Sequence, residues 1–221
     1  MLSRIADILV PAVGRLSVST DAHAELRPGS IIAPNHTALA DPAIVVAAMR
    51  RLGLADPVIM AAAGLWRLPL LGRVLKREGH IPVIRGDRRA SAALDMAAEA
   101  LEQGRLVLIY AEGRLPCRRD AAEAAPGAFR GGLARLVERT GAPVVPVGQA
   151  GARRIISGST VKQLAGLATA PVRRPHLHVH VGAPLQLTGE RAMRTAQARS
   201  AVTTAWRTAA SHLGEAAALA A

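Results

Sequence analysis

The chain has 221 residues, of which 50% are hydrophobic and only 2% aromatic. This length fits one α/β domain and buries roughly 70% of the unfolded surface, so the fold needs no disulfide scaffold, and we expect one domain over residues 1–221. The single cysteine, Cys117, excludes an internal disulfide and a cysteine metal cluster and suits a reducing compartment. The formal net charge of +12 indicates an anionic partner: a membrane surface, a nucleic acid or a phosphorylated substrate.

Residues 1–14 are predicted to form a short amphipathic helix. Asp7 and Pro11 interrupt its apolar positions, which excludes a signal peptide. Such a helix packs on the domain or lies on a bilayer, and the sequence leaves both open. The chain has no run of about 18 to 20 apolar residues, so we expect no transmembrane span. The apolar positions of the helix are Leu2, Ile5, Ile8, Leu9 and Val13.

Short apolar runs alternate with longer segments of helical period along the rest of the chain. This alternation predicts an α/β fold, with a mostly parallel mixed sheet flanked by helices. The expected strands are 15–19, 30–33, 57–61, 80–84, 106–110, 143–147 and 176–181. The expected helices are 42–52, 64–76, 90–103, 129–140 and 190–212.

A histidine and a carboxylate lie on either side of an expected helix start, in the segment Asn35–Pro42. Five residues turn through about 140° on a helix, so His36 and Asp41 share no helix face and need a bend between them. Asp41 as N-cap and Pro42 as the first helical residue supply that bend. An Asp41 oxygen then accepts from one imidazole nitrogen and leaves the other free as a general base. In the alternative interpretation, Asp41 only caps the helix and His36 is a surface histidine.

Two further segments carry open interpretations. Residues 64–77 are apolar with basic side chains and Trp66, which fits a bilayer-edge segment or a core helix with solvated arginines. His176, His178 and His180 share one strand face, but the outer two lie about 13 Å apart, so all three cannot bind one metal ion. We therefore expect the polar outer face of a late strand and no metal site. One Tyr, one Phe and two Trp are too few for base stacking, so we expect no nucleic acid partner.

Four separated blocks, in order along the chain, resemble the motifs of one family. Asn35-His36 with Asp41 is similar to N-H-x-x-x-x-D, Gly79–Arg85 to G-x-I-x-V-x-R, Tyr110–Arg114 to F-P-E-G-T-R, and Ala142–Val147 to a V-x-P strand, with Pro69–Gly72 just before the second block. Through these blocks, residues 31–151 resemble the core of the glycerophospholipid acyltransferases, typified by 1-acylglycerol-3-phosphate acyltransferase. The third block departs from the family pattern, because Ala111 stands in place of proline and Arg114 follows Gly113 directly.

The resemblance implies a glycerol-3-phosphate acyltransferase-like fold and an enzyme without cofactor or metal. The implied reaction moves a fatty acyl group from acyl-CoA or acyl-carrier protein to the hydroxyl of a lysophospholipid such as 1-acylglycerol-3-phosphate. His36 is then the base, and Asp41 orients it. Direct attack by the acceptor alcohol needs no nucleophilic residue, which agrees with the lack of a G-x-S-x-G elbow near the pair.

The resemblance also implies which residues bind the substrates. Arg85 and Arg114 bind the acceptor phosphate through their two-pronged guanidinium groups, and Glu112 holds the arginines or an acceptor hydroxyl in place. Gly113 and Pro146 complete the implied substrate-binding set. Two alternatives stay open: an acyltransferase for a non-phosphorylated or non-glycerol acceptor, and a non-catalytic lipid-binding protein of the membrane surface.

The expected location is the bacterial cytoplasm, peripheral on the inner face of the cell membrane, where the basic charge meets anionic lipid. About 30 residues precede the first block. We therefore expect the longer membrane-binding helical region of some relatives to be short or missing in this sequence.

Overall fold

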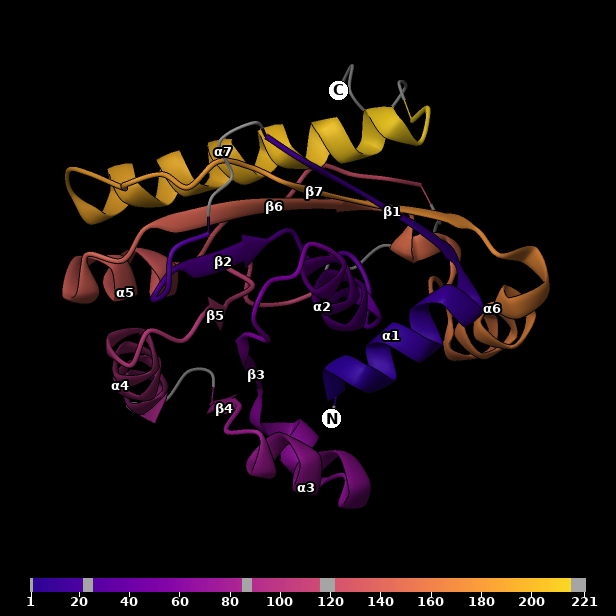
Figure 1. Cartoon of the computed structure of the whole chain (residues 1–221), viewed down its shortest axis with the longest axis horizontal. Helices are drawn as coiled ribbons and strands as arrows, with labels where there is room; N and C mark the ends of the chain where they lie inside the picture. The colour runs from indigo at the N-terminus through magenta and orange to yellow at the C-terminus, as the bar shows by residue number, and fades with distance from the viewer. Residues whose placement is uncertain (1, 22–25, 85–88, 116–121, 216–221) are drawn as a thin grey trace.

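One sheet of seven strands forms the centre of the computed structural model (Figure 1). The structure describes residues 2–21, 26–84, 89–115 and 122–215, and Arg85 and Cys117 lie outside these ranges. The strands are β1 (Arg15–Thr20), β2 (Ile31–Pro34), β3 (Val58–Ala62), β4 (Ile81–Val83), β5 (Val107–Leu108), β6 (Val144–Ala150) and β7 (His176–Val181). The helices are α1 (Leu2–Val13), α2 (Asp41–Arg51), α3 (Pro69–Arg77), α4 (Arg89–Glu102), α5 (Gly132–Thr140), α6 (Thr160–Arg173) and α7 (Arg191–His212), with two short 3₁₀ helices, η1 (Ala63–Arg67) and η2 (Ala152–Arg154).

The strand order in the sheet is β1-β7-β6-β2-β5-β3-β4. The five strands from β6 to β4 run parallel to one another. Strand β7 is antiparallel to β6, and β1 pairs with β7 in parallel. The expected mixed, mostly parallel sheet is therefore confirmed, as are all seven expected strands. β5 is shorter than expected, and β6 extends to Ala150. Every residue of β2 and β6 is buried, as in sheets covered by helices on both faces.

Helices cover both faces of the sheet and enclose two main apolar cores. Ile32 on β2 packs in the core beneath α1 and α2, whereas its neighbour Ile31 packs in the core beneath α4, α5 and α7. Successive strand residues point to opposite faces, which explains how two adjacent isoleucines serve two cores. Figure 1 shows α7 lying along one face of β6 and β7, with α2 on the other.

The segment expected as one helix over residues 64–76 is divided in two. Pro69 begins α3, and Leu68 before it is extended, at φ −78° and ψ 121°, because a proline disfavours helical backbone in the preceding residue. The 3₁₀ helix η1 fills the space before this break. A Cβ on Gly72 would lie 2.3 Å from the Trp66 carbonyl oxygen, so only glycine allows this close return of the chain.

The sequence did not predict α6. Its interior contains Gly166 and Pro171, two residues that normally argue against a helix. Pro171 falls in the last turn, and the Ser159 hydroxyl accepts from the Lys162 N–H at the other end. None of the helices in the described ranges is both long and apolar enough to cross a membrane.

Candidate functional site

The carboxyl ends of three neighbouring strands gather the expected site residues. β5, β2 and β6 are adjacent and parallel, so the segments that follow them leave the same edge of the sheet. His36 follows β2, Glu112 follows β5, and Arg153 follows β6. Ligand sites of open α/β sheets lie at this edge.

The Asp41 carboxylate accepts hydrogen bonds from the loop before α2. The predicted N-cap role of Asp41 is wrong, because α2 begins at Asp41 itself and its N-cap residue, Ala40, makes no side-chain cap. Asp41 Oδ2 instead accepts from the N–H groups of Thr37, at 2.5 Å, and Ala38, at 2.8 Å. The loop therefore folds back onto the first residue of the helix.

This fold-back brings His36 and Asp41 together. His36 Nδ1 lies 2.9 Å from Asp41 Oδ2, and the Thr37 hydroxyl donates to Oδ1 at 3.2 Å. The Asp41 side chain is completely buried, and the His36 side chain is 15% exposed. An ionised carboxylate only accepts hydrogen bonds, so the imidazole proton is on Nδ1 and the lone pair on Nε2 is available for a proton. His36 is therefore not a plain surface histidine, and Asp41 does more than begin a helix.

Glu112 holds the backbone of the histidine loop. One carboxylate oxygen accepts from the His36 N–H at 2.8 Å, and the other accepts from the Gly127 N–H at 2.8 Å. Burial raises the pKa of the Glu112 carboxyl above its ordinary value, although these two donors act in the opposite direction. The implied role for Glu112 was to hold the arginines or an acceptor hydroxyl. The geometry supports a different task, which is to position the loop that carries His36.

Three further residues at this edge had no role in the analysis of the sequence, although Asn35 and Tyr110 lie within its motif blocks. The Tyr110 ring stacks on the His36 imidazole with centroids 4.1 Å apart, and its hydroxyl is buried with no hydrogen-bond partner among the described residues. Burial raises the pKa of Tyr110 well above its ordinary value, so the phenol stays neutral. The Asn35 side chain donates to the Gln149 carbonyl at 3.1 Å and accepts from the Gln149 N–H at 2.8 Å. These bonds fasten the end of β2 to β6.

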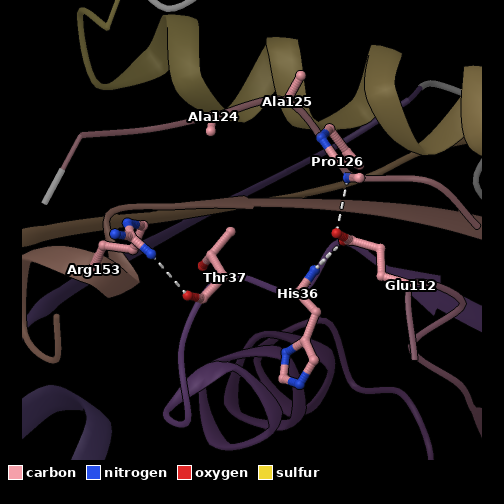
Figure 2. Close-up of a pocket in the computed structure, with 8 residues that line it drawn as sticks. His36, Thr37, Glu112, Ala124, Ala125, Pro126 and Arg153 are labelled. Atoms are coloured by element: carbon pink, nitrogen blue, oxygen red, sulfur yellow. Dashed lines mark hydrogen bonds between the residues drawn. The ribbon is translucent and has the colours of Figure 1, made fainter. Parts of the chain in front are cut away.

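Two cavities adjoin at this edge and share Glu112 and Gly127 in their walls. The first has a volume of about 230 Å³ and the second about 340 Å³. Figure 2 shows the Glu112 carboxylate and the Arg153 guanidinium on one side of the loop backbone and the His36 imidazole on the other. Arg153 is buried and donates to the Thr37 carbonyl at 3.3 Å, so it supports the same loop. The first cavity is lined by His36, Thr37, Glu112, Ala124, Ala125, Pro126, Gly127 and Arg153.

The other implied substrate residues are not all gathered at the histidine. Arg114 is exposed and lines the second cavity, directly after Gly113, whose φ of 71° is in the left-handed region that favours glycine. Pro146 is buried within β6 beside Ala33 and lines neither cavity. Arg85 follows β4, the outermost strand, and lies outside the described residues.

Two of the three histidines of β7 lie in a buried hydrogen-bond chain rather than on an outer face. The prediction of a polar outer face is wrong for His178 and His180, which are 2% and 7% exposed. The Ser17 and Ser19 hydroxyls of β1 contact the two nitrogens of His178 at 2.7 and 2.9 Å, and Ser19 also contacts His180. The His178 ring stacks on His212 of α7. No group of side chains in the described ranges is arranged to hold a metal ion.

We expect acid to destabilise the fold through His178. Burial and the neighbouring His212 and His180 lower the pKa of His178 to about 4. The unfolded chain, with a histidine pKa near 6.5, binds the proton first, so the free energy of unfolding falls as the pH drops from about 6.5 to 4, by up to about 3 kcal/mol. Urea unfolding across this range should show a steeper loss for the wild type than for His178→Gln. His176→Gln, an exposed change on the same strand, is the control. Equal slopes for wild type and His178→Gln would contradict the expectation.

Comparison with known proteins gives one family and one fold. Residues 15–149, more than half of the chain, match the model of a family described as Acyltransferase. No curated protein matches the chain. Among solved structures, the chain is similar to the crystal structure of the 1-acyl-sn-glycerophosphate (LPA) acyltransferase PlsC from Thermotoga maritima. The TM-score is 0.69 with 15% sequence identity, over 93% of this chain and 78% of that one. At this identity, the likeness shows that the two proteins share the fold.

Proposed function

Because the chain belongs to the acyltransferase family, we propose that it transfers a fatty acyl group from acyl-CoA or acyl-carrier protein to the hydroxyl of a lysophospholipid such as 1-acylglycerol-3-phosphate. The observation that carries the proposal is the hydrogen bond of 2.9 Å between His36 Nδ1 and the buried Asp41 carboxylate. It leaves Nε2 of a neutral imidazole as the base for an alcohol.

The proposed reaction needs one proton carrier and no covalent enzyme intermediate. His36 Nε2 takes the proton of the acceptor hydroxyl while that oxygen attacks the thioester carbonyl carbon and the C–O bond forms. The tetrahedral intermediate then collapses, the C–S bond breaks, and the imidazolium returns the proton to the leaving sulfur. The Asp41 carboxylate stabilises the positive charge on the imidazolium between these steps. Glu112 and Arg153 keep the loop in place, so His36 meets the acceptor with little reorganisation.

A phosphate on the acceptor requires cations at the same edge of the sheet. Arg114 lines the cavity next to Glu112, and Arg85 follows β4, which runs parallel to β2 and therefore ends at the same edge. We assign both arginines to the phosphate, with Gly113 beside Arg114 in the surrounding substrate site, whereas Pro146, buried within β6, has no contact with either cavity. The net charge of +12 supports an anionic acceptor in an anionic membrane, and we place the enzyme peripherally on the inner face of the cell membrane.

The departure in the third block favours a second candidate, an acyltransferase for a non-phosphorylated or non-glycerol acceptor. Variants of Arg85 distinguish the two candidate functions. If the acceptor carries a phosphate, Arg85→Lys should raise the acceptor KM by about tenfold, because an ammonium group lacks the two-pronged geometry, and Arg85→Ala should raise it further. The measurement is kcat/KM on a phosphorylated acceptor and its dephosphorylated counterpart.

The control for this experiment is Arg105→Ala. Arg105 precedes β5, at the opposite edge of the sheet, and its loss removes the same charge. Hydrolysis of the donor thioester without acceptor should be nearly unchanged in all three variants. An Arg85→Ala enzyme with an unchanged preference between the two acceptors would favour the second candidate.

A further inference from the structure

Helix α1 buries two small side chains and Val10, and it exposes three of its large apolar side chains. Ser3, Ala6 and Val10 are buried. Ile8 is 71% exposed and Leu9 55% exposed. At 100° per residue, Ile8 lies on the side of the helix opposite to Ala6 and Val10. Three of the five apolar positions, Ile5, Ile8 and Leu9, are therefore exposed, whereas Val13 packs against the core.

Helix α6 repeats this inverted arrangement. Ala170 is fully buried, and a Cβ on Gly166 would lie 2.3 Å from the Ile155 carbonyl oxygen, so the side of small residues faces the domain. Val161, Leu164 and Val172 are 76%, 65% and 89% exposed. These three lie within about 80° of one another around the helix and away from Ala170 and Gly166. The side of a surface helix that faces water is normally polar.

The two inverted helices contact each other. Figure 1 shows α1 and α6 beside each other, away from α4 and α5. Of the thirteen large apolar side chains that are exposed in the described ranges, these two helices carry seven. We call them the α1–α6 face: Ile5, Ile8, Leu9, Val161, Leu164, Leu167 and Val172. Apolar side chains gathered in this way mark a contact surface, whereas scattered ones need no explanation.

The charges on α1 and α6 indicate what kind of partner the α1–α6 face binds. Arg4 on α1 and Lys162, Arg173 and Arg174 at the two ends of α6 are exposed cations. α6 contains no acidic residue, and the one acidic residue of α1, Asp7, pairs with Arg50 at 2.5 Å. Apolar side chains flanked by cations match the boundary between headgroups and acyl chains in a membrane with anionic lipid.

We propose that the α1–α6 face docks the protein on the surface of an anionic bilayer. This inference rests on the proposed function, because a lipid acceptor is the reason why the protein must reach a membrane surface. It assigns to α1 the bilayer contact that the sequence left open, and it adds α6 as a second docking helix. By contrast, α3 exposes Arg73, Lys76 and Arg77 with Leu70, so its outer face is largely polar.

Vesicle sedimentation tests the docking face without reference to catalysis. The purified protein is mixed with vesicles of phosphatidylcholine and phosphatidylglycerol in equal parts, or of phosphatidylcholine alone. Leu164→Asp and Ile8→Asp should each lower the partition coefficient for the mixed vesicles at least about tenfold. Each change removes an apolar side chain that the bilayer would bury and adds a negative charge that anionic lipid repels. The matched control is Met193→Asp, which changes an exposed apolar residue of α7. It should bind the mixed vesicles like the wild type.

Two further measurements separate the possible failures. Acyl transfer between a short-chain donor and a water-soluble short-chain acceptor, without vesicles, should be unchanged in Leu164→Asp and Ile8→Asp. If both variants bind vesicles as the wild type does, the docking face is wrong while the proposed function stands. If the wild type binds through this face but transfers no acyl group, the proposed function fails alone. A dimer in light scattering that Leu164→Asp dissolves would overturn the bilayer in favour of a second copy.

Discussion

Replacing His36 by alanine should lower kcat for acyl transfer by about 10²- to 10⁴-fold, because the acceptor hydroxyl loses its base. The fold should survive. The imidazole is partly exposed, and the donors of Thr37 and Ala38 still satisfy the Asp41 carboxylate. Initial rates together with thermal unfolding of the same preparation measure both effects.

His176→Ala is the control for His36→Ala, since it removes an exposed histidine that lines neither cavity and should leave kcat unchanged. Full activity in a folded His36→Ala protein would remove the base assignment. A loss of both activity and folding would instead show that His36 acts through structure.

The second large effect is expected for Asp41→Asn, which should lower kcat by about 10²- to 10³-fold. Asp41 Oδ2 accepts from the loop N–H groups and from His36 Nδ1 together, so an asparagine oxygen at that position keeps these bonds but carries no negative charge. The imidazolium that forms when His36 takes the acceptor proton is then less stable, and the barrier to acyl transfer rises. The same change in the Ser-His-Asp triad of serine proteases costs about 10⁴ in kcat, where the asparagine also imposes the wrong tautomer.

The acceptor KM distinguishes a weakened base from a collapsed site. Asp41→Asn should leave KM within a few fold of the wild type while kcat falls, and the free energy of unfolding should drop by about 1 to 3 kcal/mol. Asp56→Asn removes an exposed carboxylate of the same kind and should change neither quantity much. A kcat for Asp41→Asn close to that of the wild type would refute the orienting role.

The strands and the His36–Asp41 pair were predictable because local patterns carry them. Apolar runs of Val and Ile define buried parallel strands, and the short loop between β2 and α2 limits where the two side chains can go. The N-cap assignment failed for a local reason as well. The Asp41 carboxylate accepts from the N–H groups of Thr37 and Ala38 instead of from N–H groups in the first turn of α2.

The supports of the site could not be predicted, because their partners are distant in the sequence. The Glu112 contact with the His36 N–H joins residues 76 positions apart, and the Asn35 and Gln149 bonds join residues 114 apart. No spacing pattern identifies such pairs. The one signal present was Gln149, a polar residue that follows the expected apolar strand 143–147 and lies within β6. α6 escaped prediction because its glycine and proline oppose a helix, and tertiary contact with Ile155 overrides them.

The most direct test of the central claim is mass spectrometry of the products made by purified protein. The protein is offered long-chain acyl-CoA with a panel of lysophospholipids and their dephosphorylated counterparts, in parallel with His36→Ala. The account predicts that a phosphorylated lysophospholipid gains the mass of one acyl group with the wild type and that this product almost disappears with His36→Ala. No acylated product from any acceptor, or an undiminished product with His36→Ala, would contradict it.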